Sequence, residues 1–147
     1  MASESLILTG ITADFASFLE SVEAAQEEFA EGRPSDFKGL WSHTDEATLC
    51  GGHGGVIERG WRNVGARLDW ASSTYREADR SSQIVSGHVG ADIAYLVRKE
   101  VIEARIGGEA GRSRQELRVT MVFRRVDDGW RIIHRHADAQ TTPALPR

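Results

Sequence analysis

The side chains in this sequence best suited to moving a proton are Asp45 and His53. Asp45 precedes a short strand-like segment, and His53 stands between two glycine pairs, GGHGG at 51–55. A carboxylate or an imidazole whose pKa is adjusted by burial can act as a general acid or base near neutral pH. The same positions also suit a turn cap and an exposed turn histidine. Both residues are therefore catalytic candidates, with a local structural role as the alternative.

Arg118 and Arg135 lie in strand-like segments and can hold an anionic group. Arginine binds a carboxylate or a phenolate through two parallel hydrogen bonds. A guanidinium inside an apolar core is retained only when it is paired. The partner of Arg118 is then either a ligand or an internal acid such as Asp45 or Glu58.

Two aromatic residues and a strand with two histidines complete the candidates. Tyr95 can orient a ligand through its hydroxyl, and Trp41 can form a wall at a pocket mouth, although packing explains both. His134 and His136 share a strand face with Asp138, and a His-x-His pair can chelate zinc. Asp138 lies about 13 Å from His134 at roughly 3.3 Å per residue, which makes a poor metal site. We expect no metal and no cofactor.

Hydrophobic spacing predicts the elements that position these residues. Phe15, Phe18, Val22 and Phe29 recur at helical spacing, and Thr12 can cap that helix. Segments rich in β-branched and aromatic residues fill the second half of the chain. Helices followed by a run of antiparallel strands indicate an α+β fold. The expected helices are 12–31, a short one from Ser35 to Trp41, and 58–73; the expected strands are 47–50, 83–90, 92–105, 115–126 and 129–138.

The composition is that of one globular domain of 147 residues, with 40% hydrophobic and 27% charged residues. We expect a single domain over 1–147, with a core at about 12–140 and a frayed tail at 141–147. The net charge of −4 argues against nucleic acid as a partner. No apolar run is long enough to cross a membrane. Cys50 is the only cysteine, and the first residues lack a secretory pattern, so the expected compartment is the cytoplasm.

Four segments resemble the SnoaL-like domains of the NTF2-like superfamily. They are ERGW (58–61), DIAYLVRKEV (92–101), ELRVTMVFRRVDDGW (116–130) and WRIIHRHAD (130–138). They are also similar to the association domain of calcium/calmodulin-dependent protein kinase II. The resemblance implies a cone, the cystatin-like α+β roll, in which a curved antiparallel sheet wraps about three helices. It further implies a pocket inside the cone and a homodimer formed by the other face of the sheet.

The resemblance also implies which strand face lines the pocket. The kinase association domain has arginines at three pocket positions, and this sequence matches them with Val97, Arg118 and Ala137. Alternation along the strands then places Tyr95 and Arg135 in the pocket beside Arg118. The opposite face, expected at the dimer interface, carries Trp130, His134, His136, Met121 and Phe123.

The resulting hypothesis is a SnoaL-like homodimer whose cone binds a small polar or anionic organic molecule. One alternative is an enzyme of the same fold, of the isomerase, cyclase or dehydratase type, that moves a proton with Asp45 or His53. The other is a non-catalytic oligomerisation module. The first predicted helix contains no tyrosine, which argues against steroid isomerisation as it occurs in this superfamily.

Overall fold

The computed structural model describes residues 7–127 and 129–143. The expected tail at 141–147 therefore lies partly outside the described residues. The described part of the chain forms the helices α2 (Ala13–Ala30), α3 (Ser35–Gly39) and α4 (Trp61–Ser73). In α2, Phe15, Val22 and Ala25 are buried, and the Thr12 hydroxyl accepts from the Phe15 backbone N–H. The predicted cap and apolar stripe of this helix are confirmed.

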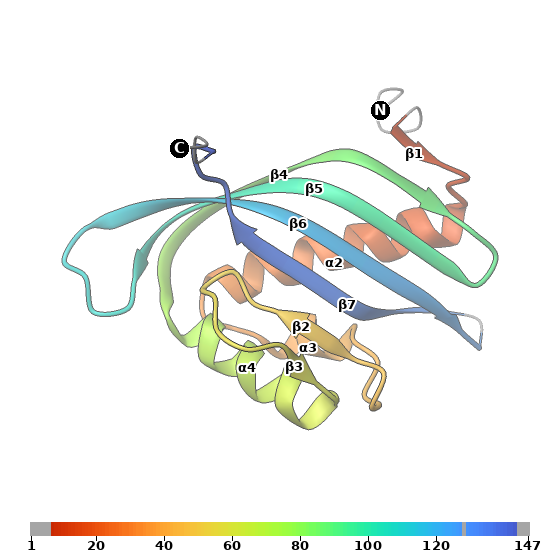
Figure 1. The fold of residues 1–147 in the computed structure, drawn as a ribbon, viewed down its shortest axis with the longest axis horizontal. Coiled ribbons are helices and arrows are strands. Elements are labelled where there is room, and N and C mark those ends of the chain that lie inside the picture. Colours follow the sequence, from red (N-terminus) through yellow and green to blue (C-terminus); the bar gives the residue numbers. More distant parts are fainter. Residues whose placement is uncertain (1–6, 128, 144–147) are drawn as a thin grey trace.

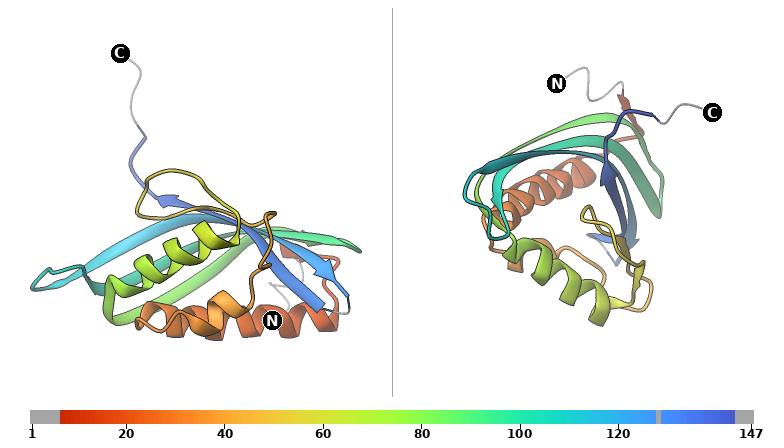
Figure 2. Two further views of the ribbon diagram at one scale, coloured as in Figure 1. Left: turned by 90° about the horizontal axis from the view of Figure 1, so that it is seen from below. Right: turned by 60° about the vertical axis from the view of Figure 1, so that its left-hand side comes forward.

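Seven strands form one curved sheet in the order β1-β4-β5-β6-β7-β2-β3. Strands β4 to β7 are antiparallel neighbours, while β1 joins β4 and β2 joins β7 in parallel. The sheet does not close on itself; it curves around α2, and α4 lies across the open side (Figures 1 and 2). The α+β roll is therefore confirmed. The strands are β1 (Leu8–Thr9), β2 (Thr48–Cys50), β3 (Glu58–Arg59), β4 (Tyr75–Val89), β5 (Ile93–Ile106), β6 (Arg112–Val126) and β7 (Gly129–Ala139).

Strand β4 begins well before the predicted start at Gln83. Its first part, Tyr75 to Ser82, is mostly polar, so residue preferences gave no strand signal there. The segment is extended because it pairs with β5, with Tyr75 opposite Ile106 and Ser82 opposite Glu100. This pairing brings Tyr75 and Arg80 to the inner face of the sheet.

Aromatic side chains fill much of the space between sheet and helices. The Phe15 ring meets Phe123 and Trp130 edge-on. The Phe37 ring is edge-on to Trp41, which bridges Ile132 on β7. All five aromatic residues are buried. Farther along the inner face of the sheet, β5 carries the buried charged residues Arg98 and Glu100.

The structure corrects the predicted strand faces. On β6, Leu117, Val119, Met121 and Phe123 are buried on the inner face, and Arg118 points outward. Burying this apolar row removes more hydrocarbon from water than burying the alternating residues Arg118, Thr120 and Val122 would. Met121 and Phe123 therefore belong to the core, not to a dimer interface.

A bulge in β7 explains why Trp130, which we expected at the dimer interface, faces the core. Val122 pairs with His134 but Phe123 pairs with Ile132, so Ile133 is an extra residue on β7. Because of it, Trp130 faces inward before the bulge and Arg135 faces inward after it. Trp130 is thus also a core residue. Simple alternation had placed Trp130 and Arg135 on opposite faces.

Candidate functional site

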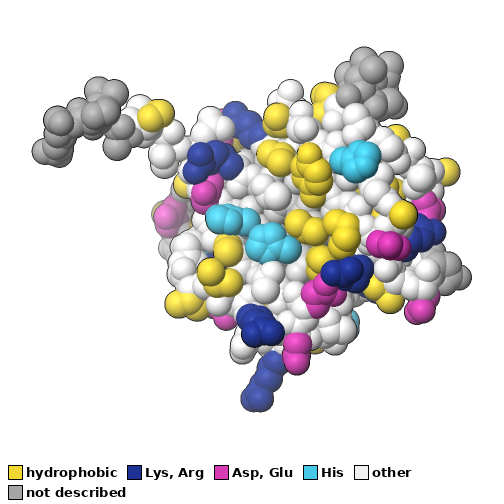
Figure 3. Space-filling model, turned by 45° about the vertical axis from the view of Figure 1, so that its right-hand side comes forward, with side chains coloured by type: hydrophobic (Ala, Val, Ile, Leu, Met, Phe, Trp, Pro, Cys, Tyr) yellow, Lys and Arg dark blue, Asp and Glu magenta, His cyan; other side chains and the backbone are white. Residues whose placement is uncertain are grey.

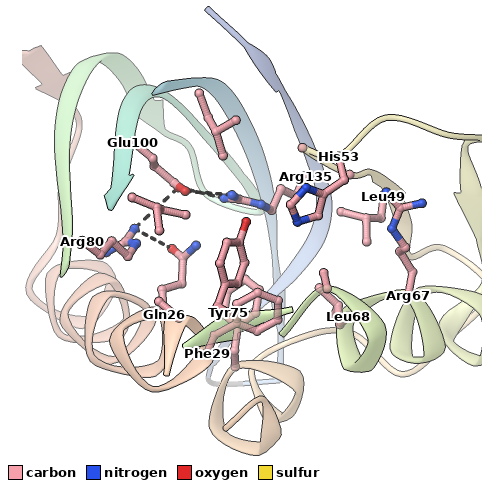
Figure 4. Close-up of a pocket in the computed structure, with 17 residues that line it drawn as sticks. Gln26, Phe29, Leu49, His53, Arg67, Leu68, Tyr75, Arg80, Glu100 and Arg135 are labelled. Carbon is pink, nitrogen blue, oxygen red and sulfur yellow. Dashed lines mark hydrogen bonds and ion pairs between the residues drawn. The ribbon is translucent and has the colours of Figure 1, made fainter. Parts of the chain in front are cut away.

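A small pocket lies in the middle of the cone, between the inner face of the sheet and the helices. Its volume is about 50 Å³, space for a few water molecules. Buried residues line the inner end, whereas Gly51, His53 and Arg67 at the other end are partly exposed. The labelled lining residues are Gln26, Phe29, Leu49, His53, Arg67, Leu68, Tyr75, Arg80, Glu100 and Arg135 (Figure 4).

The inner wall is a network of paired charges centred on Glu100, which is fully buried. Both terminal nitrogens of Arg135 donate to its carboxylate oxygens at 2.8 Å. Nε of Arg98 donates to the same carboxylate at 2.8 Å, and Arg80 approaches to 3.6 Å. On the helix side, Glu23 and Gln26 accept from both Arg80 and Arg98. The network ties α2 to three strands.

The arginines keep Glu100 ionised despite its burial. Burial by itself would raise the pKa of this carboxyl, but Arg135 and Arg98 outweigh that effect and hold the pKa well below its usual range. Glu100 therefore neutralises neighbouring cations and is not available as a proton acceptor near pH 7.

The other end of the pocket carries a chain of hydrogen bonds through His53. The Tyr75 hydroxyl donates to Oε1 of Gln115 at 2.9 Å, and Nε2 of Gln115 lies 3.4 Å from Nδ1 of His53. Nε2 of His53 lies 3.4 Å from the Thr74 hydroxyl, which donates to the Ala71 carbonyl. Because Nε2 of Gln115 can only donate, Nδ1 of His53 is the acceptor, and the ring proton of His53 is on Nε2.

The ionisation of both ring groups follows from burial. Burial and the nearby Arg67 lower the pKa of His53, so its imidazole is neutral at pH 7. Burial raises the pKa of Tyr75 to about 12, so its phenol keeps its proton. The pocket therefore presents a neutral imidazole and a neutral phenol beside cationic guanidinium groups.

Of the predicted site residues, the structure brings only Arg135 and His53 to the pocket. Tyr95 is 42% exposed on the outer face. Arg118 is also outside, where its guanidinium donates to both oxygens of Asp138 at 2.8 and 3.0 Å. Its partner is neither a pocket ligand nor one of the two acids considered from the sequence.

The other predicted residues also lie outside the pocket. Trp41 is buried in the aromatic core, and Asp45 is exposed near Gly60. His134 and His136 lie on the outer face, where Nδ1 of His134 is 2.8 Å from the Thr48 hydroxyl. Within residues 7–127 and 129–143, no three His, Cys, Asp or Glu side chains are placed to hold a metal ion.

Sequence reasoning missed most of the pocket's polar lining: Gln26, Arg67, Tyr75, Arg80 and Glu100. One signal was available for Glu100. Arg98 and Glu100 continue the row of β5 that includes Ala94 and Leu96, which are buried. Two opposite charges in an apolar row indicate a buried pair. For the others, the local sequence carried no comparable signal.

Comparisons with known proteins agree with this architecture. The model of the SnoaL-like domain family matches residues 19–139. Among solved structures, an NTF2-like superfamily protein from Salmonella enterica is 18% identical, with a TM-score of 0.73 over 88% of this chain and 93% of its own. A ketosteroid isomerase-like protein from Erwinia carotovora is 13% identical, with a TM-score of 0.73 over 90% and 100% of the two chains.

A third structure, from Thiobacillus denitrificans, is described as a candidate calcium/calmodulin-dependent protein kinase type II association domain. It is 20% identical, with a TM-score of 0.70 over 90% of this chain and all of its own. Identities this low show a shared fold alone. No curated protein matches the chain.

The fold is a cone like that of the NTF2-like structures above, with a pocket between sheet and helices. Because the family model covers most of the sequence, the chain belongs to the SnoaL-like domain family. Among the helices described by the structure, none is long and apolar enough to span a membrane.

Proposed function

We propose that this SnoaL-like domain binds a small polar or anionic organic molecule in its central pocket. The observation that carries the proposal is the charge of the lining. Three guanidinium groups, those of Arg67, Arg80 and Arg135, line the pocket. Arg135 is paired with Glu100 and Arg80 with Glu23, whereas the carboxylate nearest to Arg67, that of Glu58, is 4.0 Å away. His53 is neutral and adds no charge. A cavity with a weakly paired guanidinium and apolar walls favours an anion with a hydrocarbon part.

The size of the pocket limits the ligand. A volume of about 50 Å³ accommodates a compact molecule or one end of a longer one. Phe29, Leu49 and Leu68 supply apolar contacts, so the ligand combines a polar group with a short hydrocarbon body.

The test is a binding experiment with a blocked pocket. Acetate, isobutyrate, benzoate and their neutral amides are titrated into the ¹⁵N-labelled protein, and the NMR shifts are followed. Ala71 lines the pocket on α4, and Ala66 is exposed on the same helix. We expect Ala71→Leu to abolish binding and Ala66→Leu to leave it unchanged. Binding that survives in both variants, or shifts that avoid the lining residues, would contradict the proposal.

A second candidate function, proton transfer, is favoured by the His53 hydrogen-bond chain. A neutral imidazole linked through Gln115 to a protonated Tyr75 suits acid–base chemistry on a small carbonyl compound. Asp45 does not fit this role because it lies outside the pocket. The test is deuterium incorporation next to the carbonyl in small ketones and 2-oxo acids. Exchange that is lost in His53→Gln would support an enzyme; equal exchange in both proteins would exclude this role for His53.

The outer face of the sheet supports a homodimer. Val85, Ile93 and Tyr95 are 59%, 39% and 42% exposed, and one face of the molecule groups hydrophobic and histidine side chains inside a border of charges (Figure 3). Covering such a patch with a second copy removes apolar surface from water. We expect a dimer by sedimentation equilibrium, and a monomer for Tyr95→Glu. A larger wild-type assembly would favour the oligomerisation module instead, and a wild-type monomer would refute both.

A further inference from the structure

Arg67 differs from the other arginines of the pocket in its partners. Arg135 and Arg80 each have a carboxylate oxygen at 3.0 Å or less. The nearest carboxylate to Arg67 is that of Glu58, whose Oε2 lies 4.0 Å from Nη1. The Arg67 side chain is nevertheless only 13% exposed. It is therefore a largely buried cation whose ion pair with Glu58 is long.

One donor of this guanidinium is also unsatisfied. Nε of Arg67 is buried and has no hydrogen-bond acceptor. Among the residues that the structure describes, the other buried side-chain nitrogens in this state belong to Trp41, Arg105 and Trp130, which do not line the pocket. Buried donors are nearly always paired with protein, water or ligand. An unpaired one in a pocket indicates where an acceptor is to be bound.

The glycine-rich turn provides the space for this guanidinium. A Cβ at Gly51 would lie 2.7 Å from Nη2 of Arg67, and one at Gly55 would lie 2.9 Å from Nη1. The carbonyl of Gly54 accepts from Nη2 at 2.6 Å, and the Trp70 ring stacks on the group with 4.9 Å to its centroid. The turn thus holds Arg67 with one backbone carbonyl, which carries no full charge.

We infer that Arg67 is the residue that binds the ligand's charged group, and that the ligand is a small monocarboxylate. This inference rests on the proposed function of the pocket. Nε and Nη2 form one edge of the guanidinium, and a carboxylate can accept from both at once. One ligand oxygen replaces the Gly54 carbonyl on Nη2, and the other pairs with Nε. The hydrocarbon body then lies against Leu68 and Leu49.

Binding in this geometry shifts the turn. Gly51 covers the Nε side of the guanidinium, so the carboxylate reaches it only when the turn moves. Gly54 and Gly55 have φ values of +83° and +97°, a region that glycine enters without steric cost.

The experiment compares isobutyrate and benzoate with isobutyramide and benzamide, which match them in shape but carry no charge. The NMR signal of the Arg67 Nε–H, assigned by its loss in Arg67→Lys, reports the contact directly. We expect the carboxylates to bind roughly ten times more tightly or better than the amides, and to move this signal and that of the Gly54 amide. Arg67→Gln should reduce carboxylate affinity to that of the amides, whereas Arg62→Gln, an exposed arginine on the same helix, should not.

The outcomes separate this inference from the proposal on which it rests. If carboxylates and amides bind equally, and Ala71→Leu abolishes both, the pocket is a binding site but Arg67 does not select for charge. If carboxylates bind more tightly than amides and Arg67→Gln preserves this difference in affinity, another arginine binds the carboxylate. If no probe binds the wild-type protein, the inference is overturned. Should Arg67→Gln fail to fold, Arg67→Lys keeps the charge and loses Nε, and we expect an intermediate affinity from it.

Discussion

Replacing Glu100 by glutamine tests the charge network in the middle of the cone. The change keeps the size of the side chain and removes its negative charge. Three guanidinium groups, those of Arg80, Arg98 and Arg135, would then face Glu23 and a neutral amide. Because all three are nearly inaccessible to water, solvent cannot make up for the lost carboxylate.

The expected loss is large. Arg135 and Arg98 contact Glu100 through three hydrogen bonds of 2.8 Å. Removing one member of a buried ion pair costs about 3–5 kcal/mol, because the remaining charge stays buried. In a domain of this size each kcal/mol shifts the melting temperature by about 2–4 °C. We therefore expect Glu100→Gln to lower Tm by roughly 6–20 °C.

Calorimetry and urea unfolding measure this loss, and the pH dependence checks its cause. The folded-state pKa of Glu100 lies well below 4.5, so its stabilising effect is complete above about that pH and is lost as the pH falls through the folded pKa. The gap between wild type and Glu100→Gln should be full at pH 7 and shrink in acid. Asp138→Asn, an exposed member of an ion pair, is the control and should change Tm little. Equal losses in the two variants, or a gap that does not depend on pH, would refute the reasoning.

Two further predictions concern the outer face and the glycine turn. We expect Arg118→Ala to keep both fold and pocket binding, because Arg118 contacts an exposed acid outside the pocket; a loss of binding in the NMR titration would contradict its placement. We expect Gly51→Ala to displace the Arg67 guanidinium, since the new Cβ would lie 2.7 Å from Nη2, and so to move the Arg67 Nε–H signal. Gly54→Ala meets no neighbour within 4 Å and should instead lower the free energy of unfolding by about 1–2 kcal/mol through its positive φ. If Gly54→Ala moved the Arg67 signal and Gly51→Ala only lowered the stability, the described turn would be wrong.

The order of helices and strands could be predicted because local pattern determines it. The apolar spacing and Thr12 cap of α2 are readable without any tertiary information. The polar start of β4 was not, because Tyr75–Ser82 is extended only through its pairing with β5.

The faces of the sheet were only partly predictable. The row Leu117, Val119, Met121 and Phe123 is apolar throughout, which is typical of an inner face, but we predicted it at the dimer interface. The resemblance of Arg118 to a pocket arginine pointed the other way and was misleading, since the low identity of the solved relatives carries fold and not side-chain roles.

The pocket itself depends on contacts between distant parts of the chain. Arg135 meets Glu100 across 35 positions, and Arg98 meets Gln26 across 72. Such pairings follow from the curvature of the sheet and from the position of α2 beneath it. Neither is encoded in a local sequence pattern, so the polar residues that line the pocket could be identified only from the structure.

The bulge at Ile133 decides which side chains of β7 face the cavity. If the same residues formed a regular strand without a bulge, a β7 anchored at Trp130 would present His134 and His136 to the cavity in place of Arg135 and Ala137. Deleting Ile133 would instead remove the bulge and keep Arg135 facing the cavity, because Ile132 already pairs with Phe123 and His134 with Val122. The position of the bulge in β7 therefore determines the lining of this cavity as much as the identity of the residues does.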